Sequence, residues 1–210
     1  RLVTKQTGAD GLPVSAVLLD ERIAVARELY LALTLDRFRA TPMVLASRQG
    51  GVDIEDVAAA SPEAILREPI DSPRSNNLER GEAVVRGSLD GVTGAALQRV
   101  TGALGLTGAL ASSCQQLIRD AWQLFVSSDA ALIEINPLVV TEDQRLLALD
   151  AKMTLDDNAL FRHEELARLR DESQEHSLEL EASRIGISYV GLDGTIGCLV
   201  NGAGLAMATN

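Results

Sequence analysis

The sequence predicts an α/β fold, with an antiparallel sheet first and the start of a parallel α/β unit near the carboxyl end. Two observations predict the antiparallel part. Apolar runs flank the polar cluster 141–144, as in a β-hairpin, and residues 108–125 carry the apolar stripe of a packed helix. The third observation is the apolar run 196–200 with a glycine turn directly after it. This order of strand, turn and helix is typical of parallel α/β domains.

Composition and charge exclude several classes of protein. The 210 residues can bury a sizeable core in one or two domains. A content of 46% hydrophobic and 23% charged residues is typical of a soluble globular chain. Aromatic residues make up 3%, so aliphatic side chains and alanine must fill the core. The net charge of −11 disfavours nucleic acid, whose phosphates are bound through clustered Lys and Arg.

The sequence also indicates the compartment. It contains no run of about 18 apolar residues, which would predict a transmembrane helix, and its first residues lack a signal-peptide pattern. Cys114 and Cys198 lie far apart in apolar stretches. We expect both thiols to be reduced and buried, as in a cytosol-like compartment.

The remaining elements follow from periodicity and from turn residues. We expect strands at 2–6 and 13–20 around an Asp-Gly turn, and further strands at 26–36, 42–47, 186–190 and 196–200. Short helices are expected after Asp53 and after Ser61, and longer ones over 93–104 and 108–125. The stripe of the last helix predicts that it packs into the core through Leu110, Cys114, Leu117, Ile118, Ala121 and Leu124.

The hairpin over 132–153 carries polar residues inside its apolar runs. Its register depends on the loop, because a slip of one residue moves every side chain to the other face. With the three-residue loop 142–144, Thr141 pairs with Arg145. Asn136 then lies opposite Asp150, and Glu134 lies opposite Lys152.

A carboxylate and an amide oxygen side by side on rigid strands suit Mg²⁺, which takes few protein ligands and completes its shell with water and phosphate. Asn136 and Asp150 are therefore candidate metal ligands. The alternative is that these polar residues line the solvated face of an ordinary antiparallel sheet.

Three other features have both a structural and a chemical interpretation. The pair Gly50-Gly51 precedes a helix and could bind an anion, but we favour a tight turn with Asp53 as the helix N-cap. His163 and His176 have no other ligand at metal-binding spacing, so we expect both on a solvated helix face. The charged stretch that ends near residue 183 is the best linker candidate.

Four stretches carry a resemblance to a known family: ASRQGGVDIEDVA, EINPLV followed by LDAK, DDNALFRHEELARLRD, and LDGTIGCLVNGAGLAMATN. They resemble the ATP-grasp domain of succinyl-CoA synthetase β subunits, also called succinate–CoA ligases, and the last is also similar to ATP-citrate lyases. The resemblance covers nearly the whole chain. Residues 70–92 depart from it, and their clusters of Ser, Asn, Arg and Gly predict a surface insertion.

The resemblance implies a division of the chain. Residues 1–22 would end the first ATP-grasp subdomain, 23–182 would form the second, and 183–210 would begin a flavodoxin-like carboxyl-terminal ligase domain. It also implies a fragment, in which the nucleotide-clamping lysine and glycine-rich loop would precede Arg1. Most of the last domain would follow Asn210, so residues from about Gly186 onward, with Asn201 and the glycine turn, should be poorly buried in this chain. Such a fragment should not catalyse the reaction alone.

The resemblance also assigns roles to residues of the first part. Asn136 and Asp150 match the Mg²⁺ ligands that present the nucleotide phosphates, and Glu134 matches the catalytic glutamate that meets the partner subunit's histidine. Asp20 and Glu28 match acidic positions of the segment that contacts the nucleoside.

Roles near the carboxyl end follow in the same way. Asn201 matches an asparagine that holds substrate beside the phosphohistidine, and the turn from Gly202 to Gly204 opens a helix whose positive end faces that phosphate. Lys152 would balance Glu134 across the hairpin, with a phosphate contact as the less favoured role.

The function implied is that of a succinate–CoA ligase β subunit, an enzyme subunit that uses Mg²⁺ and ATP/ADP or GTP/GDP. It would form succinyl-CoA through a phosphohistidine on a partner α subunit, in a heterodimer or heterotetramer, in the bacterial cytoplasm or the mitochondrial matrix. Neither a membrane nor nucleic acid is an expected partner. The alternatives are a malate–CoA ligase, an ATP-citrate lyase-like chain, or a non-catalytic assembly module.

Overall fold

The computed structural model describes residues 1–3, 11, 14, 16–17, 19–36, 38–39, 41–70, 91–170, 172, 177–187, 189–191, 195–202 and 205. The chain divides into two compact units. One comprises Leu18–Ala167, and the other combines Arg1–Val17 with Arg168–Asn210. The subdomain boundaries expected from the sequence are not tested by this division and stay a prediction.

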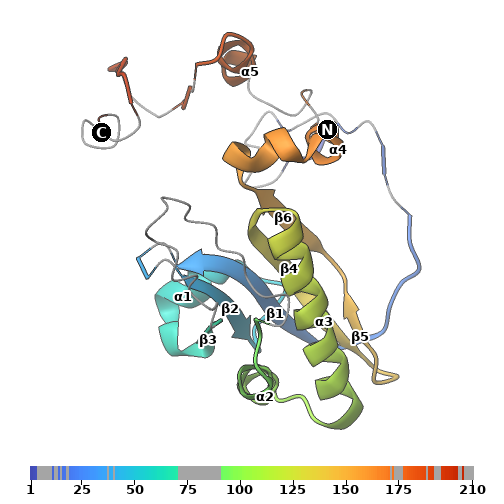
Figure 1. The fold of residues 1–210 in the computed structure, drawn as a ribbon. Coiled ribbons are helices and arrows are strands. Elements are labelled where there is room, and N and C mark those ends of the chain that lie inside the picture. Colours follow the sequence, from blue (N-terminus) through green and yellow to red (C-terminus); the bar gives the residue numbers. More distant parts are fainter. Residues whose placement is uncertain are drawn as a thin grey trace. The chain divides into compact units, whose positions relative to one another are not determined.

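The first unit contains a six-stranded antiparallel sheet (Figure 1). Its order is β3-β2-β1-β4-β5, and β6 also pairs with β4. The strands are β1 (Val25–Asp36), β2 (Thr41–Ser47), β3 (Ile65–Pro69), β4 (Ala130–Thr141), β5 (Leu146–Ala148) and β6 (Ala151–Leu155). The antiparallel sheet predicted for this part of the chain is therefore confirmed, as are the strands expected near 26–36 and 42–47.

The described residues also form α-helices and 3₁₀-helices. They are α1 (Ile54–Ala60), η1 (Pro62–Ala64), α2 (Gly94–Ala103), α3 (Gly108–Ser127), η3 (Asp157–Arg162), α4 (Glu164–Ala167) and, in the other unit, α5 (Ser177–Arg184). Helix α2 packs on β2 and β3, and α3 packs on β1, β4 and β5. Asp53 caps α1 as predicted, since its side chain accepts a hydrogen bond from the backbone N–H of Glu55.

The core lies between the sheet and helices α2 and α3. Alternate residues of the strands point into it, among them Leu31 and Leu33 of β1 and Ile133 and Ile135 of β4. From α3 come Cys114, Ile118, Ala121, Trp122 and Phe125. The rings of Trp122 and Phe125 stack with centroids 5.8 Å apart. Burial raises the pKa of the Cys114 thiol to about 12, as suits a cysteine used for packing.

The predicted stripe of α3 is partly wrong. Cys114, Ile118 and Ala121 are buried as expected, Leu110 and Leu117 are partly buried, but Leu124 is 47% exposed. The large rings of Trp122 and Phe125 occupy the buried face instead. The predicted stripe omits the two aromatic residues. The buried face of the helix is therefore turned from the predicted one, toward Trp122 and Phe125.

One carboxylate is buried on the helix-covered side of the sheet. Glu68 of β3 has only 8% of its side chain exposed, and its carboxylate accepts hydrogen bonds from Arg99 of α2. The donors are Nε at 2.9 Å and Nη2 at 2.6 Å, a paired geometry that makes this contact stronger than a single hydrogen bond. This pair joins the edge strand β3 to α2.

The predicted hairpin register is confirmed. The backbone N–H of Thr141 donates to the Arg145 carbonyl at 2.9 Å, and that of Asn136 donates to the Asp150 carbonyl at 3.1 Å. Glu134 pairs with Lys152. Gln144 closes the three-residue loop at φ 60°, the left-handed residue that such a hairpin requires.

The strands expected near the amino terminus are not formed in the part of the chain that the structure describes. Leu2 makes an isolated bridge, residues 14, 16, 17, 19 and 20 are irregular, and the rest of 4–18 lies outside the described residues apart from Gly11. Apolar alternation predicts a strand only if a neighbour supplies hydrogen bonds, and none of these described residues belongs to the sheet.

The strands expected at 186–190 and 196–200 are also wrong for their described residues, which are irregular. The expected exposure is confirmed, since Ile196 is 87% and Leu199 is 93% exposed. Cys198 is exposed rather than buried. A strand of a parallel sheet exists only through its neighbours, and no described residue of this region pairs with another strand.

The segment expected to be a surface insertion is described only at its ends. Ile70 and Val92 are buried and belong to the core, and residues 71–90 lie outside the described residues. The expected insertion is therefore shorter than 70–92, because both end residues pack with α2 and the sheet.

Candidate functional site

Strand β4 carries core and candidate site residues alternately. Ile133 and Ile135 point into the core, so Glu134 and Asn136 point to the other face of the sheet. Opposite residues of an antiparallel pair share a face, which places Lys152 with Glu134 and Asp150 with Asn136. The structure thus brings together three of the predicted site residues, namely Glu134, Asn136 and Asp150, on a single hairpin.

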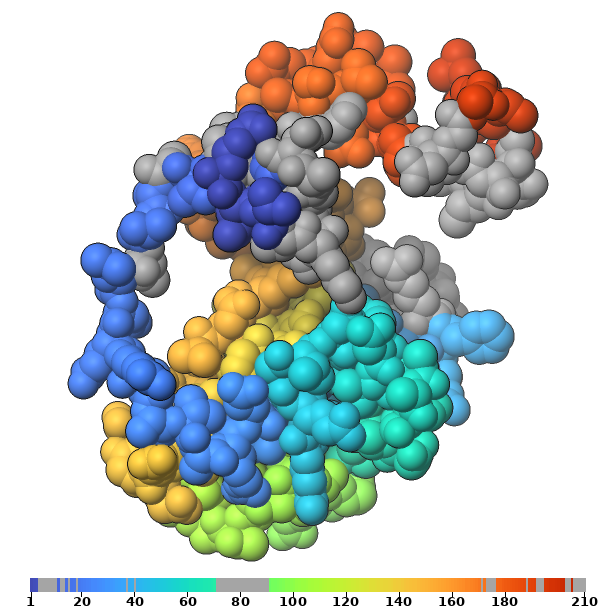
Figure 2. Space-filling model, turned by 180° about the vertical axis from the view of Figure 1, so that it is seen from behind, coloured from blue at the N-terminus to red at the C-terminus, as the bar shows by residue number. Residues whose placement is uncertain are grey.

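A glycine loop far from the hairpin in sequence binds the Asn136 side chain. The backbone N–H of Gly51 donates to Asn136 Oδ1 at 2.7 Å, and Asn136 Nδ2 donates to the Val52 carbonyl at 2.9 Å. Figure 2, seen from the side opposite that of Figure 1, shows the surface of this region (cyan) next to that of β4 (yellow). The loop follows β2 and leads into α1. It is the turn predicted at Gly50-Gly51, and it contacts the hairpin through Asn136.

Both positions of the glycine pair require glycine. Gly51 has φ +71°, and a Cβ there would overlap the Glu28 carboxylate. A Cβ at Gly50 would overlap the backbone of Leu29, and the Gly50 N–H donates to the Glu28 carbonyl at 3.2 Å. The loop therefore lies directly against strand β1, and the predicted site residue Glu28 belongs to the same neighbourhood as Asn136.

Negative charge accumulates around the loop. Burial, followed by the charges of Glu134 and Glu55, raises the pKa of Tyr30 above its ordinary value. A side-chain hydrogen bond with Asp53 raises the pKa of Glu55, and the charge of Glu134 contributes in the same direction. Tyr30 and Glu55 were not predicted from the sequence as neighbours of Glu134. Tyr30 alternates with core residues on β1, and this is the signal that would have placed it on the site face.

The donor set at Asn136 and Asp150 fits Mg²⁺. One carboxamide oxygen and one carboxylate occupy opposite positions of the hairpin, and Asp150 is exposed. Oxygen donors of this kind suit a hard cation that keeps waters and finds further ligands on a substrate phosphate. Asn136 Oδ1 accepts one hydrogen bond from Gly51, and a carbonyl oxygen has a second lone pair available for an ion.

The remaining predicted site residues lie outside the hairpin. Asp20 is exposed, and its carboxylate accepts a hydrogen bond from the neighbouring Glu21 N–H at 2.7 Å. Asn201 and Gly202 are exposed as expected, with Gly202 at φ +122°, and Gly204 lies outside the described residues. Asn201 and Gly202 belong to the other unit, so they are described separately from the hairpin site.

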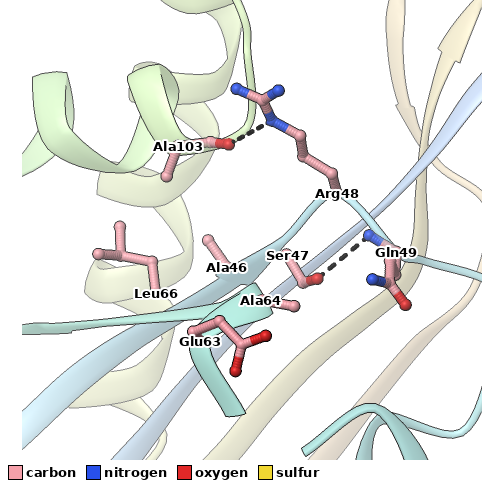
Figure 3. A pocket seen from close by; sticks show the side chains of 8 residues that line it. All are labelled: Ala46, Ser47, Arg48, Gln49, Glu63, Ala64, Leu66 and Ala103. Atoms are coloured by element: carbon pink, nitrogen blue, oxygen red, sulfur yellow. Dashed lines mark hydrogen bonds between the residues drawn. The ribbon is translucent and has the colours of Figure 1, made fainter. Parts of the chain in front are cut away.

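A pocket of about 400 Å³ opens at the end of β2, and none of the predicted site residues lines it (Figure 3). Its lining comprises Ala46, Ser47, Arg48, Gln49, Glu63, Ala64, Leu66 and Ala103. Arg48 Nε donates to the Ala103 carbonyl at 2.7 Å, at the carboxyl end of α2. A guanidinium at that end satisfies a terminal carbonyl and complements the helix dipole. Arg48 thus has a structural task in this pocket.

The prediction of a solvated helix face for His163 is wrong, and His176 lies outside the described residues. His163 follows η3 with 14% of its side chain exposed, and its Nε2 lies 2.6 Å from Asp129 Oδ2. Arg162 donates to the same carboxylate from Nε and Nη2, each at 2.6 Å. Asp129 therefore joins the turn between α3 and β4 to the segment after the hairpin.

We predict that Asp129→Asn lowers the free energy of unfolding by about 1–3 kcal/mol at neutral pH, since it removes hydrogen bonds to charged partners. Asparagine tolerates the positive φ of 51° at this position. The hydrogen bond from Arg162, and after it that from His163, lowers the pKa of Asp129. Because the folded pKa lies below the unfolded one, the stabilisation is complete above the unfolded value and is lost as the pH falls through the folded value.

Denaturant unfolding of the wild-type protein and the variant at neutral pH and below about pH 4 checks this, because the difference should shrink in acid. Asp143→Asn is the matched control. Asp143 also pairs with an arginine, but both side chains are more than half exposed, and we expect no measurable change. Equal effects of the two substitutions at neutral pH would contradict the role of Asp129.

Comparison with known proteins identifies the class to which this fold and site belong. The family model described as "ATP-grasp domain" matches residues 1–140. The chain belongs to the ATP-grasp family.

The similar sequences belong to a narrower group of proteins. The chain is 48% identical over 209 residues to the β subunit of ADP-forming succinate–CoA ligase from Thioalkalivibrio sulfidiphilus, covering 100% of this chain and 50% of that protein. It is 45% identical over 208 residues to the mitochondrial β subunit of GDP-forming succinate–CoA ligase from Dictyostelium discoideum, covering 99% and 46%. The corresponding ADP-forming subunit of Caulobacter sp. strain K31 is 46% identical, with 99% and 48% covered. The chain spans about half the length of these relatives.

A solved structure is also similar, at a lower level. It is an ATP citrate lyase from Methanothrix soehngenii in complex with citrate and coenzyme A, 17% identical, with a TM-score of 0.46. The match covers 77% of this chain and 33% of that one. This TM-score is too low to support a conclusion about substrate.

The part of the chain that the structure describes contains no helix with the length and apolar character of a membrane span.

Proposed function

We propose that this chain is part of the β subunit of a succinate–CoA ligase, an enzyme that joins succinate and coenzyme A at the cost of a nucleoside triphosphate. The observation that carries the proposal is the pairing of Asn136 with Asp150, at adjacent positions of one hairpin. It occurs in a chain that is 43–48% identical over its whole length to β subunits of that enzyme.

The proposed reaction has three steps. A histidine on a partner α subunit takes the terminal phosphoryl group of the nucleoside triphosphate, and the nucleoside diphosphate leaves. A succinate carboxylate then takes the phosphoryl group from the histidine, which gives succinyl phosphate. Finally the thiol of coenzyme A attacks the acyl carbon, inorganic phosphate leaves, and succinyl-CoA is formed. Each step is reversible.

Within this reaction the hairpin residues hold the nucleotide end. The Asn136 carboxamide and the Asp150 carboxylate would bind Mg²⁺, which when present neutralises charge on the phosphate oxygens. The Glu134 carboxylate lies on the same face of β4 and would orient the partner subunit's histidine by accepting its N–H. Glu28 and Asp20 would accept hydrogen bonds from the nucleoside. Lys152, which lies opposite Glu134 on the hairpin, would balance its charge.

The other unit would hold the substrate end. The Asn201 side chain would donate to succinate or its phosphate, and the glycines at 202 and 204 would let the backbone approach that anion closely. Asn201 and Gly202 are both exposed and are therefore accessible to a substrate. A location in the bacterial cytoplasm or the mitochondrial matrix follows from the same proposal.

The test uses the intact protein that contains this chain, together with its α subunit. We expect Mg²⁺-dependent binding of ADP or GDP, phosphorylation of the α-subunit histidine by the matching triphosphate, and CoA-ester formation from succinate. A panel with malate and citrate separates this function from related ligases. Phosphorylation without formation of a CoA ester from succinate would overturn succinate as the proposed substrate. The absence of metal-dependent nucleotide binding would overturn the proposed ligase function.

A further inference from the structure

The Asn136 carboxamide has a fixed orientation. Its oxygen accepts from the Gly51 N–H at 2.7 Å, and its nitrogen donates to the Val52 carbonyl at 2.9 Å. Because the same loop supplies one donor and one acceptor, a flipped amide would face donor to donor and acceptor to acceptor. The loop therefore determines which way Oδ1 points, although it lies 85 residues away in sequence.

The loop in turn is fixed by strand β1. Gly50 lies against the backbone of Leu29 and donates to the Glu28 carbonyl, and Gly51 lies against the Glu28 carboxylate. The contacts to Leu29 and to the Glu28 carbonyl involve backbone atoms, which cannot move aside as a side chain can. The position of the loop is thus defined by the sheet that carries the hairpin on its next strand, β4.

We propose that the loop of residues 50–52 positions Asn136 as a metal ligand, and that Gly51 is the residue on which this positioning depends. The inference rests on the proposed function, and it adds the loop of residues 50–52 to the proposed metal site. The Gly51 N–H uses one lone pair of Asn136 Oδ1 and leaves the other for the ion. Outer groups that orient a ligand of this kind contribute strongly to metal affinity.

The test is Gly51→Ala in the intact protein. The new Cβ would displace the Glu28 carboxylate and strain a backbone at φ +71°, and we expect the loop to relieve this strain by shifting, together with the Asn136 amide. We expect the affinity for Mn²⁺ in the presence of ADP or GDP, whichever the wild-type protein binds, to fall by about tenfold or more. Electron paramagnetic resonance of free Mn²⁺ measures it. Because the new Cβ also displaces the Glu28 carboxylate, affinity for the metal-free nucleotide should fall only as far as it does in Glu28→Ala, and the additional loss that needs Mn²⁺ reports the loop.

The chain offers a matched control in Gly108→Ala. Gly108 also has a positive φ, +55°, but a Cβ there meets no atom within 4 Å. It reproduces the backbone strain without touching Asn136, and we expect both affinities to stay at the wild-type values. Gly51→Asn repeats the test with a residue that tolerates positive φ better than alanine, in case the alanine variant does not fold.

The outcomes separate this inference from the proposed function. A wild-type protein without Mn²⁺–nucleotide binding would overturn the proposed function, and this inference with it. Wild-type binding together with an unaffected Gly51 variant would overturn this inference alone. Equal losses of metal-free and metal-dependent nucleotide binding would show a general disturbance of the site, and would also overturn the positioning role.

Discussion

Replacing Asp150 with asparagine in the intact protein should slow phosphorylation of the histidine on the proposed partner subunit by about a hundredfold, a loss of roughly 3 kcal/mol in transition-state stabilisation. The substitution preserves shape but removes the negative charge that we propose binds Mg²⁺. A metal at a phosphoryl-transfer site contributes several kcal/mol by neutralising charge. Single-turnover phosphorylation by labelled ATP or GTP measures the rate.

The same substitution should leave folding nearly unchanged. Asp150 is exposed, and surface changes of this kind alter stability by less than about 0.5 kcal/mol. Asp143→Asn, in the loop of the same hairpin and also exposed, is the control for a lost charge. Wild-type phosphorylation by the Asp150 variant, or an equal loss in both variants, would show that Asp150 is not a metal ligand.

Trp122→Ala should produce the largest loss of stability, about 3–5 kcal/mol, because a buried aromatic ring leaves a cavity that the core cannot close. Trp122 is 1% exposed and stacks on Phe125 of the same helix. Chemical denaturation followed by far-ultraviolet circular dichroism measures the change. Trp122 is the single tryptophan of the chain, so its fluorescence reports unfolding of this core in the wild-type chain.

Two variants bracket this prediction. Trp122→Phe keeps an aromatic ring against Phe125 and should lose clearly less stability than the alanine variant. Phe38→Ala removes a fully exposed ring at the turn between β1 and β2, and should have no measurable effect. If Trp122→Ala unfolded at the same denaturant concentration as Phe38→Ala, the packing described for α3 would be wrong.

The hairpin could be predicted from the sequence because its register depends on residues that are close together in the chain. A period of two residues and a three-residue loop determine which side chains face each other, so the Asn136–Asp150 and Glu134–Lys152 pairs followed from counting. The contacts of Asn136 with Gly51 and Val52 could not be predicted in this way. They join positions far apart in sequence, and the glycine pair alone did not distinguish a simple turn from a loop that binds a side chain.

Other errors have different physical causes. The exposure of Leu124 followed from the size of Trp122 and Phe125, which a stripe of aliphatic residues does not represent. His163 was expected in solvent because its neighbours in sequence are charged, yet Asp129 from the turn before β4 binds it. Strands at 186–190 and 196–200 were inferred from apolar runs, and such a run forms a strand only where another strand accepts its hydrogen bonds.

Strand β4 holds core residues on one face and site residues on the other, and it is hydrogen-bonded on both edges, to β1 on one side and to β5 and β6 on the other. Glu134 and Asn136 therefore have no opening motion separate from that of the sheet. In hydrogen exchange, the β4 amides should require a free energy close to that of unfolding the whole unit, whereas loop amides exchange through smaller openings. The face that we propose binds the metal would then stay assembled between turnovers, and a nucleotide would arrive at a surface that needs no prior ordering.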